Sequence, residues 1–185
     1  MEVFTVKGLT LIELMISIAF LTIILSISIP ELGYIIDRHQ SNTAVSKLKN
    51  ILNSARIKSL NNEISLTVCP LINNQCTNSW SNTIAVFRDI DTDQILDEEE
   101  DLFLSTSLYS SNGYWLKKRS NTPFIRFSPQ GHAFSSATTF LYCPFSGNNS
   151  AAKQVIINFQ GRIRLDSYLS SNGKPFSTLA PLSCL

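Results

Sequence analysis

An acidic run between residues 89 and 100 carries the densest set of metal-ligating side chains in this sequence. Carboxylates occupy the first, third, fifth, ninth and twelfth places of a calcium-loop pattern, at Asp89, Asp91, Asp93, Asp97 and Glu100. Such loops gather carboxylate and carbonyl oxygens around the ion. Two features argue against calcium: Gln94 stands at the sixth place, where the sharp turn favours Gly, and the run follows a predicted strand instead of a helix. We therefore predict a solvated acidic loop without a metal, and keep calcium binding as an alternative.

A pair of arginines near the C-terminal end is the second chemical feature. Residues 155 to 165 alternate between apolar and polar side chains, so a strand there buries one set and exposes the other. Arg162 and Arg164 belong to the exposed set and follow Gly161, which loosens the strand. Planar guanidinium groups suit phosphate oxygens, although two exposed arginines alone are typical of any solvated surface. Further cations that would widen this basic surface are Lys117, Lys118, Arg119, Arg126, Lys153 and Lys174.

The charge distribution agrees with a basic C-terminal half. The chain of 185 residues has a net charge of +1. Residues 31–100 contain six Lys and Arg against ten Asp and Glu, whereas residues 101–185 contain eight against two. A chain of this length holds one modest domain with accessory segments.

The cysteines indicate two disulfides. The chain has four of them, at Cys69, Cys76, Cys143 and Cys184. The first two lie at a hairpin-like spacing, which leaves the last two to join a strand to the tail, although four cysteines allow three connectivities. A zinc site would need closer pairs and nearby histidines, whereas His39 and His132 lie far apart. Disulfides predict that this part of the chain lies in an oxidising compartment.

Catalytic machinery is not apparent in the sequence. There is no G-x-S-x-G motif, no phosphate-binding Gly-rich loop and no H-E-x-x-H motif, and neither histidine belongs to a recognisable triad pattern. We predict a protein that is not an enzyme and has no cofactor.

The N-terminal segment is predicted to anchor the protein in a membrane. Residues 9–29 contain a single charge, Glu13, and a helix of this length crosses the hydrocarbon core of a bilayer. A secretory signal peptide would have a shorter apolar core and a small-residue cleavage site. We therefore predict a membrane-spanning helix. Because a carboxylate is costly inside a membrane, Glu13 is expected to meet a cation.

The rest of the chain predicts a second helical segment and a β-rich head. Residues 30–62 form an amphipathic stalk helix whose apolar positions recur at spacings of three and four: Leu32, Ile35, Ile36, Ala44, Leu48, Ile51, Leu52 and Ala55. Residues 63–185 contain short β-branched and aromatic runs separated by turn residues. Such strands form an antiparallel sheet that covers the apolar side of the helix, which is an α+β fold.

The first residues resemble the class III leader of type IV pilins and pseudopilins. A short charged leader ends at Lys7-Gly8 and is followed by an apolar helix with Glu13 in its second turn. The resemblance implies that a prepilin peptidase cleaves between Gly8 and Leu9, where the family usually has Phe, and that the new terminus is methylated. It also implies that Glu13 meets the terminal amine of a neighbouring subunit during assembly. Residues 1–8 are thus predicted to be a leader peptide.

The head resembles the GspH/FimT family of minor pilins and pseudopilins, and the similarity spans nearly the full chain. The matching segments are Cys69-Pro70, Phe87-Arg88-Asp89, residues 125–131, Cys143-Pro144 and the final Gly-Arg strand. In that strand, Gly161-Arg162-Ile163-Arg164 matches the G-R-x-R motif of DNA-binding FimT-type minor pilins.

This resemblance implies a type IV pilin-like fold, in which a long N-terminal helix packs on an antiparallel β-sheet head. It implies a single-pass inner-membrane protein with its head in the periplasm, which assembles with other pilin subunits into a cell-surface pilus. It further implies sequence-independent binding of extracellular DNA for uptake in natural transformation. The residues predicted to bind DNA are Gly161, Arg162 and Arg164 of the matching motif, together with Lys117, Lys118, Arg119 and Lys174 of the basic surface.

Two other functions stay open. A minor pseudopilin at the tip of a type II secretion filament would handle protein cargo, and a calcium-binding, adhesin-like head would use the acidic loop. The pair Arg162 and Arg164 favours DNA, because a secretion tip has no need of a phosphate-binding pair.

Overall fold

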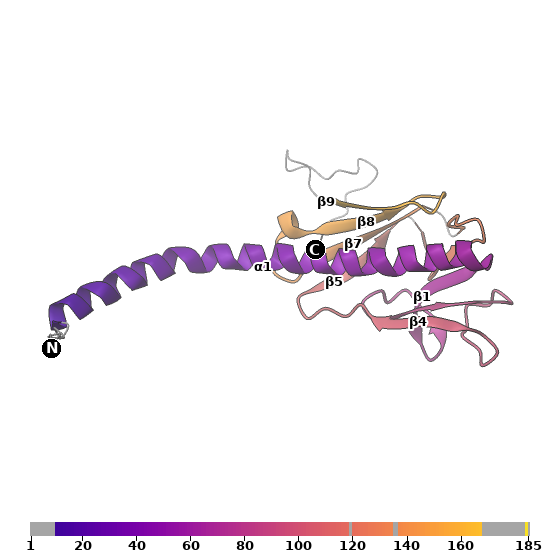
Figure 1. The fold of residues 1–185 in the computed structure, drawn as a ribbon, viewed down its shortest axis with the longest axis horizontal. Coiled ribbons are helices and arrows are strands. Elements are labelled where there is room, and N and C mark those ends of the chain that lie inside the picture. Colours follow the sequence, from indigo (N-terminus) through magenta and orange to yellow (C-terminus); the bar gives the residue numbers. More distant parts are fainter. Residues whose placement is uncertain (1–9, 119, 135–136, 168–183, 185) are drawn as a thin grey trace, which may run out of the picture. The chain divides into compact units, whose positions relative to one another are not determined.

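The computed structural model describes residues 10–118, 120–134, 137–167 and 184 (Figure 1). One long helix, α1 (Leu11–Asn62), precedes all strands. The strands are β1 (Leu66–Ile72), β2 (Gln75–Cys76), β3 (Thr83–Phe87), β4 (Leu102–Ser107), β5 (Gly113–Lys118), β6 (Ile125–Phe127), β7 (Thr138–Pro144), β8 (Lys153–Ile157) and β9 (Ile163–Ser167), with a short 3-10 helix, η1 (Asn149–Ala151), before β8. The chain divides into two compact units, residues 1–36 and residues 37–185, which we describe separately.

The first unit contains the N-terminal part of α1. Thr10 precedes the helix, and its Oγ1 accepts a hydrogen bond from the backbone N–H of Glu13 at 3.3 Å. This is one half of a capping box, in which a Ser or Thr before the helix satisfies the N–H of its third residue. Large apolar side chains between residues 11 and 25 are exposed along this stretch, with Phe20 at 64%. Among the residues that the structure describes, no helix meets the length and hydropathy that crossing a membrane requires.

In the second unit, the remainder of α1 provides one wall of the core. Val45, Leu48, Ile51, Leu52 and Ala55 are buried and belong to a single apolar cluster with side chains of both sheets. The spacing of Leu48, Ile51, Leu52 and Ala55 is what the sequence predicted, because such positions share one side of a helix, whereas Val45 was not predicted. The buried apolar side of the helix begins later in the chain than the sequence predicted.

Ile35 and Ile36, which were expected in that stripe, lie in the first unit and are exposed. They therefore take no part in the core of the head.

The strands form two antiparallel sheets. The five-stranded sheet has the order β2-β1-β3-β4, with β6 also paired to β1. The four-stranded sheet has the order β5-β7-β8-β9. The antiparallel pairing was predicted, whereas the division into two sheets was not. Both sheets contribute to the core around α1, among them Val68 and Ile84 from the first and Phe140 and Val155 from the second.

Both disulfides are present in the head. Cys69 pairs with Cys76 and closes the β1–β2 hairpin. Cys143 in β7 pairs with Cys184, so the C-terminal end of the chain is tied to the four-stranded sheet. Of the three possible connectivities, this is the one that the hairpin-like spacing of the first pair suggested.

Candidate nucleic-acid interface

The β8–β9 hairpin positions the two arginines of the G-R-x-R motif. Arg162 precedes β9 and Arg164 lies within it, and both side chains are exposed, whereas Ile163 between them is 9% exposed and faces the core. This alternation follows from the period of two in a strand. Arg162 and Arg164 thus lie on the same side of the strand, roughly 6.6 Å apart along the backbone at about 3.3 Å per residue.

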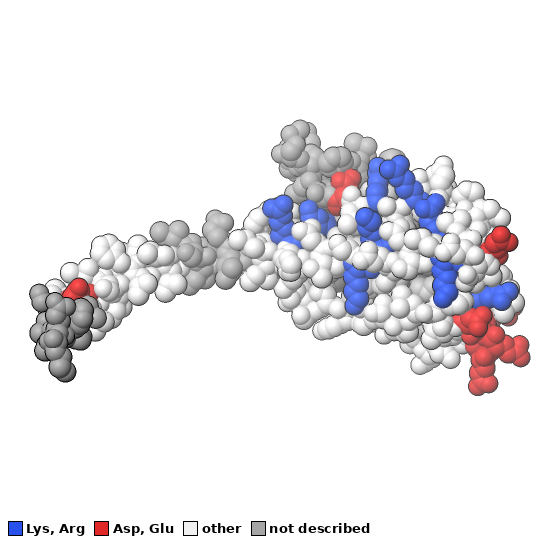
Figure 2. Space-filling model, in the orientation of Figure 1, with Lys and Arg blue, Asp and Glu red and all other residues white. Residues whose placement is uncertain are grey.

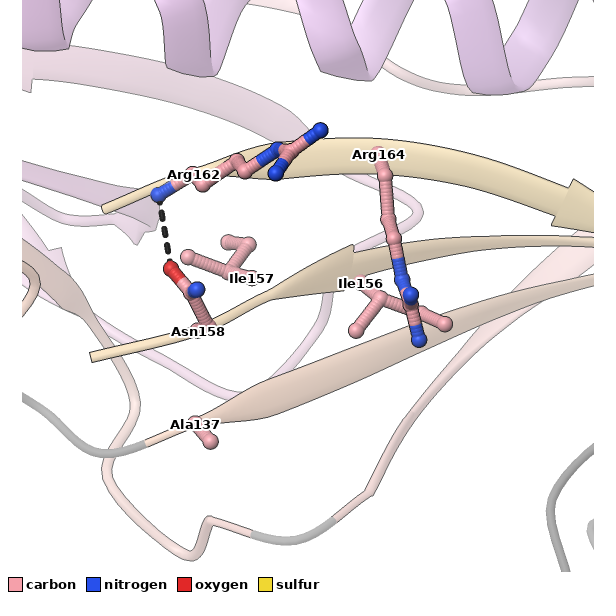
Figure 3. A pocket seen from close by; sticks show the side chains of 6 residues that line it. All are labelled: Ala137, Ile156, Ile157, Asn158, Arg162 and Arg164. Atoms are coloured by element: carbon pink, nitrogen blue, oxygen red, sulfur yellow. Dashed lines mark hydrogen bonds between the residues drawn. The ribbon is translucent and has the colours of Figure 1, made fainter. Parts of the chain in front are cut away.

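The two arginines border a groove whose other lining residues are uncharged. These are Ala137, Ile156, Ile157 and Asn158. In Figure 3, Arg164 extends from β9 across β8 past Ile156, and Arg162 runs along its own strand. No acidic side chain lines the groove in the described part of the chain. Phosphate oxygens approaching the groove would therefore meet two cationic groups and no acidic lining residue among those described.

The turn between β8 and β9 is held by hydrogen bonds within the turn and by Arg56 of α1. The Oδ1 of Asn158 accepts from the backbone N–H of Arg162 at 2.8 Å, and the N–H of Gly161 donates to the carbonyl of Asn158 at 2.9 Å. From α1, Arg56 donates through Nε to the carbonyl of Gly131 at 2.9 Å and through Nη2 to that of Gln160 at 3.2 Å. The backbone that carries Arg162 is therefore fixed to the helix.

Gly161 is required in this turn because of its backbone conformation and its close packing. Its φ is +71°, a conformation that side chains disfavour, and a Cβ there would lie 2.0 Å from the carbonyl oxygen of Gly131. Gly161 is buried, so it does not present a surface to a ligand. Gly161, which is predicted to be part of the DNA site, is thus a buried residue of the turn that carries Arg162.

The register across the four-stranded sheet places one more cation, Lys118, on the same side as Arg164. Arg164 pairs with Ile156, Ile156 with Thr139, and Thr139 with Lys118 in β5. Directly opposite residues of an antiparallel sheet point to the same side. The exposed Lys118 therefore lies on the same side as Arg164, three strands away, or about 14 Å at about 4.8 Å per strand.

Lys117 lies on the other side of the sheet, which corrects the prediction that it joins the basic surface. It pairs with Phe140, whose side chain is in the core, and its Nζ donates to the carbonyl of Thr122 and lies 5.5 Å from the centre of the Trp80 ring. Burial lowers the pKa of Lys117 from 10.5 to about 8. Successive residues of a strand face opposite sides, so Lys117 and Lys118 cannot both join Arg164.

Two other predicted cations lie outside the arginine groove. Arg126 in β6 forms an ion pair with Asp89, and Lys153 lines a different hollow beside α1 with Val45 and Leu165. Arg119 and Lys174 lie outside the described residues, as do the predicted cleavage site Gly8 and Leu9. Figure 2 shows basic side chains spread over the part of the head formed by α1 and β9, while most acidic ones gather at one end.

The acidic loop follows β3 at that end. Asp89 is buried, and its Oδ2 accepts from Thr67 Oγ1 at 3.2 Å and from Arg126. Glu100 Oε1 accepts from the N–H of Ile90 at 2.7 Å. Burial raises the pKa of Glu100 against the lowering effect of its backbone hydrogen bonds from Ile90 and Asp97. Asp97, in contrast, is exposed.

Arg56 and Asn158 are the positioning residues that sequence reasoning missed. A signal existed for Asn158, because an Asn three residues before Gly161 suits a turn in which its side chain accepts a backbone hydrogen bond. Arg56 gave no such signal. Its acceptors, Gly131 and Gln160, are 75 and 104 residues away.

The helix and the two antiparallel sheets define a pilin-like subunit with a disulfide-bearing head. Residues 44–161, more than half of the chain, match the family described as "Type II transport protein GspH". The chain therefore belongs to the GspH family.

Solved structures of minor pilins and pseudopilins share this fold. The type IV minor pilin FimU of Pseudomonas aeruginosa is similar with 17% identity and a TM-score of 0.56, over 80% of this chain and 97% of FimU. The minor pseudopilin EpsH from the Type 2 Secretion System of Vibrio cholerae is similar with 10% identity and a TM-score of 0.52, over 69% of this chain and 96% of EpsH. At these identities the likeness shows the fold alone. None of the curated proteins matches the chain significantly.

Proposed function

We propose that this chain is a minor pilin whose head binds DNA without sequence preference through Arg162 and Arg164. The observation that carries the proposal is the pair of exposed guanidinium groups beside a groove with no acidic lining residue among those described. Contacts from cationic side chains to phosphates carry no sequence information. The surface is small, so we expect weak binding at physiological salt.

The rigidity of the hairpin supports the same function. Asn158 and Arg56 hold the backbone around Arg162, so binding a phosphate does not require this backbone to be ordered first. Preorganised groups lose less conformational entropy on binding than mobile ones. Lys118, on the same side of the sheet, extends the basic surface across the strands.

Asp166 limits that surface at its far end. It follows Arg164 by two residues on the same strand and therefore lies on the same side of the sheet. The phosphate path is accordingly proposed to run from Arg162 and Arg164 across β8 and β7 toward Lys118, and not further along β9.

The placement of the chain in the cell is part of the proposal. We propose that a prepilin peptidase removes residues 1–8 and that residues 9–29 hold the precursor in the inner membrane with its head in the periplasm. Glu13 then meets the new N-terminus of another subunit in the filament, and DNA bound at the pilus is taken up in transformation. The mass of the mature chain, which should lack eight residues, checks the first step.

The second candidate is a minor pseudopilin that handles protein cargo at the tip of a type II secretion filament. The family match and the likeness to EpsH favour it, since both point to secretion as much as to pili. The two candidates differ in whether Arg162 and Arg164 contact phosphate. Binding to DNA therefore decides between them.

The test is a titration of the full-length chain in detergent with short fluorescent duplexes of different sequences, at several salt concentrations. Replacing both arginines, Arg162→Gln and Arg164→Gln, should weaken binding about tenfold or more and flatten the log-log salt slope by about two units, since each phosphate contact contributes about −0.9. A matched control is Arg38→Gln with Arg88→Gln, which removes the same charge from exposed positions outside the groove.

The control should change affinity far less than the groove variant. Lysine at both groove positions should restore only part of the affinity, because an ammonium lacks the bidentate fork. Equal affinity and slope for wild type and the groove variant would overturn DNA binding and leave secretion as the function.

A further inference from the structure

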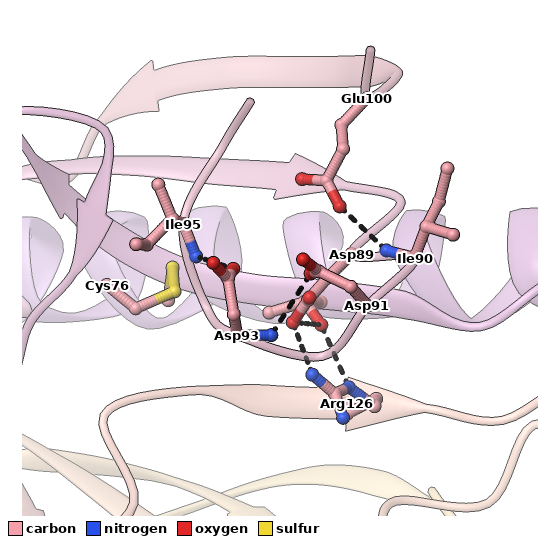
Figure 4. A network of polar contacts seen from close by, with 10 residues as sticks. Cys76, Asp89, Ile90, Asp91, Asp93, Ile95, Glu100 and Arg126 are labelled. Carbon is pink, nitrogen blue, oxygen red and sulfur yellow. Dashed lines mark hydrogen bonds and ion pairs between the residues drawn. A yellow bond between two sulfur atoms is a disulfide. The ribbon is translucent and has the colours of Figure 1, made fainter. Parts of the chain in front are cut away.

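The loop between β3 and β4 brings three carboxylates together at one point. Asp89, Asp91 and Asp93 each place an oxygen within 4.8 Å of the other two. Calcium binds oxygens at about 2.3 to 2.6 Å, so two ligands on opposite sides of one ion lie up to about 5 Å apart. The three oxygens therefore already have the mutual distances of a single coordination shell. In Figure 4, Asp91 and Asp93 lie on one side of Asp89 and Arg126 lies on the other.

A buried oxygen without a donor points to a ligand at this place. The side chain of Asp89 is 0% exposed, and Arg126 and Thr67 satisfy only its Oδ2. Oδ1 is buried and has no hydrogen-bond partner among the described residues. An unpaired buried carboxylate oxygen is costly, and such atoms are rare in folded proteins. A cation bound by Oδ1 would remove that cost.

The backbone meets the requirement that the sequence had counted against calcium. Gln94, at the sixth place, has a φ of +69°, which is the conformation for which calcium loops use Gly. The loop is held there by the β1–β2 hairpin, because Cys76 N–H donates to the carbonyl of Gln94 at 2.9 Å and Leu96 N–H donates to that of Asn74 at 2.7 Å.

The bridge between Gln75 and Ile95 determines which way the carbonyl oxygen of Ile95 points. The two hydrogen bonds of this bridge are made by the flanking residues, so the N–H and the C=O of Ile95 both point away from β2. The N–H of Ile95 accordingly donates to Asp93 Oδ1 at 2.8 Å, on the loop side. The carbonyl of Ile95, at the seventh place, faces the same side, where calcium loops use a backbone carbonyl.

We propose that this loop is a calcium site formed by Asp89 Oδ1, the carboxylates of Asp91 and Asp93, and the carbonyl of Ile95. Calcium fits better than magnesium, because it accepts six to eight oxygens in a flexible arrangement, whereas magnesium requires a near-ideal octahedron. Residues 89–101 contain eight acidic residues, so a divalent cation also reduces their mutual repulsion. The site is independent of DNA binding, and its ion would stiffen the loop against the hairpin closed by Cys69 and Cys76.

The test is calorimetric titration of calcium into the full-length chain in detergent, after removal of metals with a chelator. We expect one ion per chain with a dissociation constant of about 10⁻⁴ to 10⁻³ M, which is usual for extracellular modules, and binding of magnesium at least about tenfold weaker. Calcium should also raise the melting temperature, because it binds only the folded loop.

Charge-matched variants distinguish a calcium site with defined ligands from non-specific attraction between calcium and the acidic loop. Asp91→Ala with Asp93→Ala should weaken calcium binding about tenfold or more, because two ligands are lost. Glu98→Ala with Glu99→Ala removes the same charge from exposed side chains of the same loop and should change the affinity by about twofold at most. If the aspartate pair does not fold, the single variants Asp91→Ser and Asp93→Ser keep a short acceptor for the turns, and each should still weaken binding.

Folding of every variant is followed by the near-ultraviolet circular dichroism of Trp80 and Trp115, which are buried in the head. The proposal is overturned if about 10 mM calcium gives neither heat nor a shift in melting temperature. It is equally overturned if the glutamate pair weakens binding as much as the aspartate pair does.

Discussion

The backbone of Gly161 lies directly against the carbonyl of Gly131, so closely that a Cβ on Gly161 would stand 2.0 Å from that oxygen. The same carbonyl accepts the hydrogen bond from Arg56 Nε, and the Nε atom would itself lie 2.9 Å from the added Cβ. A residue of the G-R-x-R motif is thus tied to α1 and to the loop after β6. The glycine is needed for packing, and the arginines that follow it for surface charge.

Substitution of this glycine should therefore destabilise the head. In Gly161→Ala, the positive φ costs about 1 to 2 kcal/mol and the forced displacement of Gly131 or Arg56 about 1 to 3 kcal/mol more. We expect a loss of about 3 kcal/mol in the free energy of unfolding, measured by urea denaturation of the full-length chain in detergent. DNA binding should weaken as well, because the backbone of Arg162 shifts.

Gly147 provides the control for backbone strain. Its φ is +74°, yet nothing lies within 4 Å of an added Cβ. Gly147→Ala should thus cost only the conformational part, about 1 to 2 kcal/mol, and leave DNA binding unchanged. If the two variants lose the same stability, the close contact with Gly131 has no energetic role.

The elements that follow from local pattern could be predicted from the sequence. The buried stripe at Leu48, Leu52 and Ala55 follows from helical spacing, and the exposed Arg162 and Arg164 follow from strand alternation. The same alternation places Lys117 and Lys118 on opposite sides of their strand, so only Lys118 can share the side of Arg164.

Contacts that depend on the pairing of strands distant in sequence could not be predicted. The ion pair of Arg126 with Asp89 requires β6 and β3 to flank β1, which no local pattern indicates. The division into two sheets has the same origin, since β5 pairs with β7 instead of with its neighbour in sequence. The positive φ of Gln94 departs from residue preference, because the hydrogen bonds to the β1–β2 hairpin hold the loop in that shape.

The half-buried Lys117 should give the stability of the head a specific pH dependence. Burial lowers its pKa from 10.5 to about 8 in the folded chain. Between about pH 8 and 10.5 the unfolded chain binds more protons at this group than the folded chain does, so its contribution makes stability rise with pH. Below about pH 8 the lysine is charged in both states, and its unfavourable contribution is complete and constant.

Lys117→Met removes this titration. Urea denaturation of both proteins from pH 7 to 10.5 should show wild type gaining stability relative to the variant as the pH rises through this window. Taking the difference between the two proteins cancels the tyrosines that titrate in the same range. A difference that stays constant with pH would mean that Lys117 is solvated in the folded chain.

The neighbouring lysines provide the sharpest test of where DNA lies. Lys118 is on the side of Arg164 through the register Lys118–Thr139–Ile156–Arg164, and Lys117 is on the core side with Phe140. If phosphates follow the surface across the sheet, Lys118→Gln should reduce the salt slope by about one unit and weaken binding about two- to fivefold. Lys117→Gln removes the same charge one residue away and should change neither quantity, provided that its near-ultraviolet spectrum shows a folded head. Equal losses in the two variants would mean that only the overall charge attracts DNA, and a loss confined to Lys117→Gln would place the DNA on a different surface. Fluorescence anisotropy at several salt concentrations, with Arg162→Gln measured alongside as the reference for one lost contact, distinguishes these outcomes.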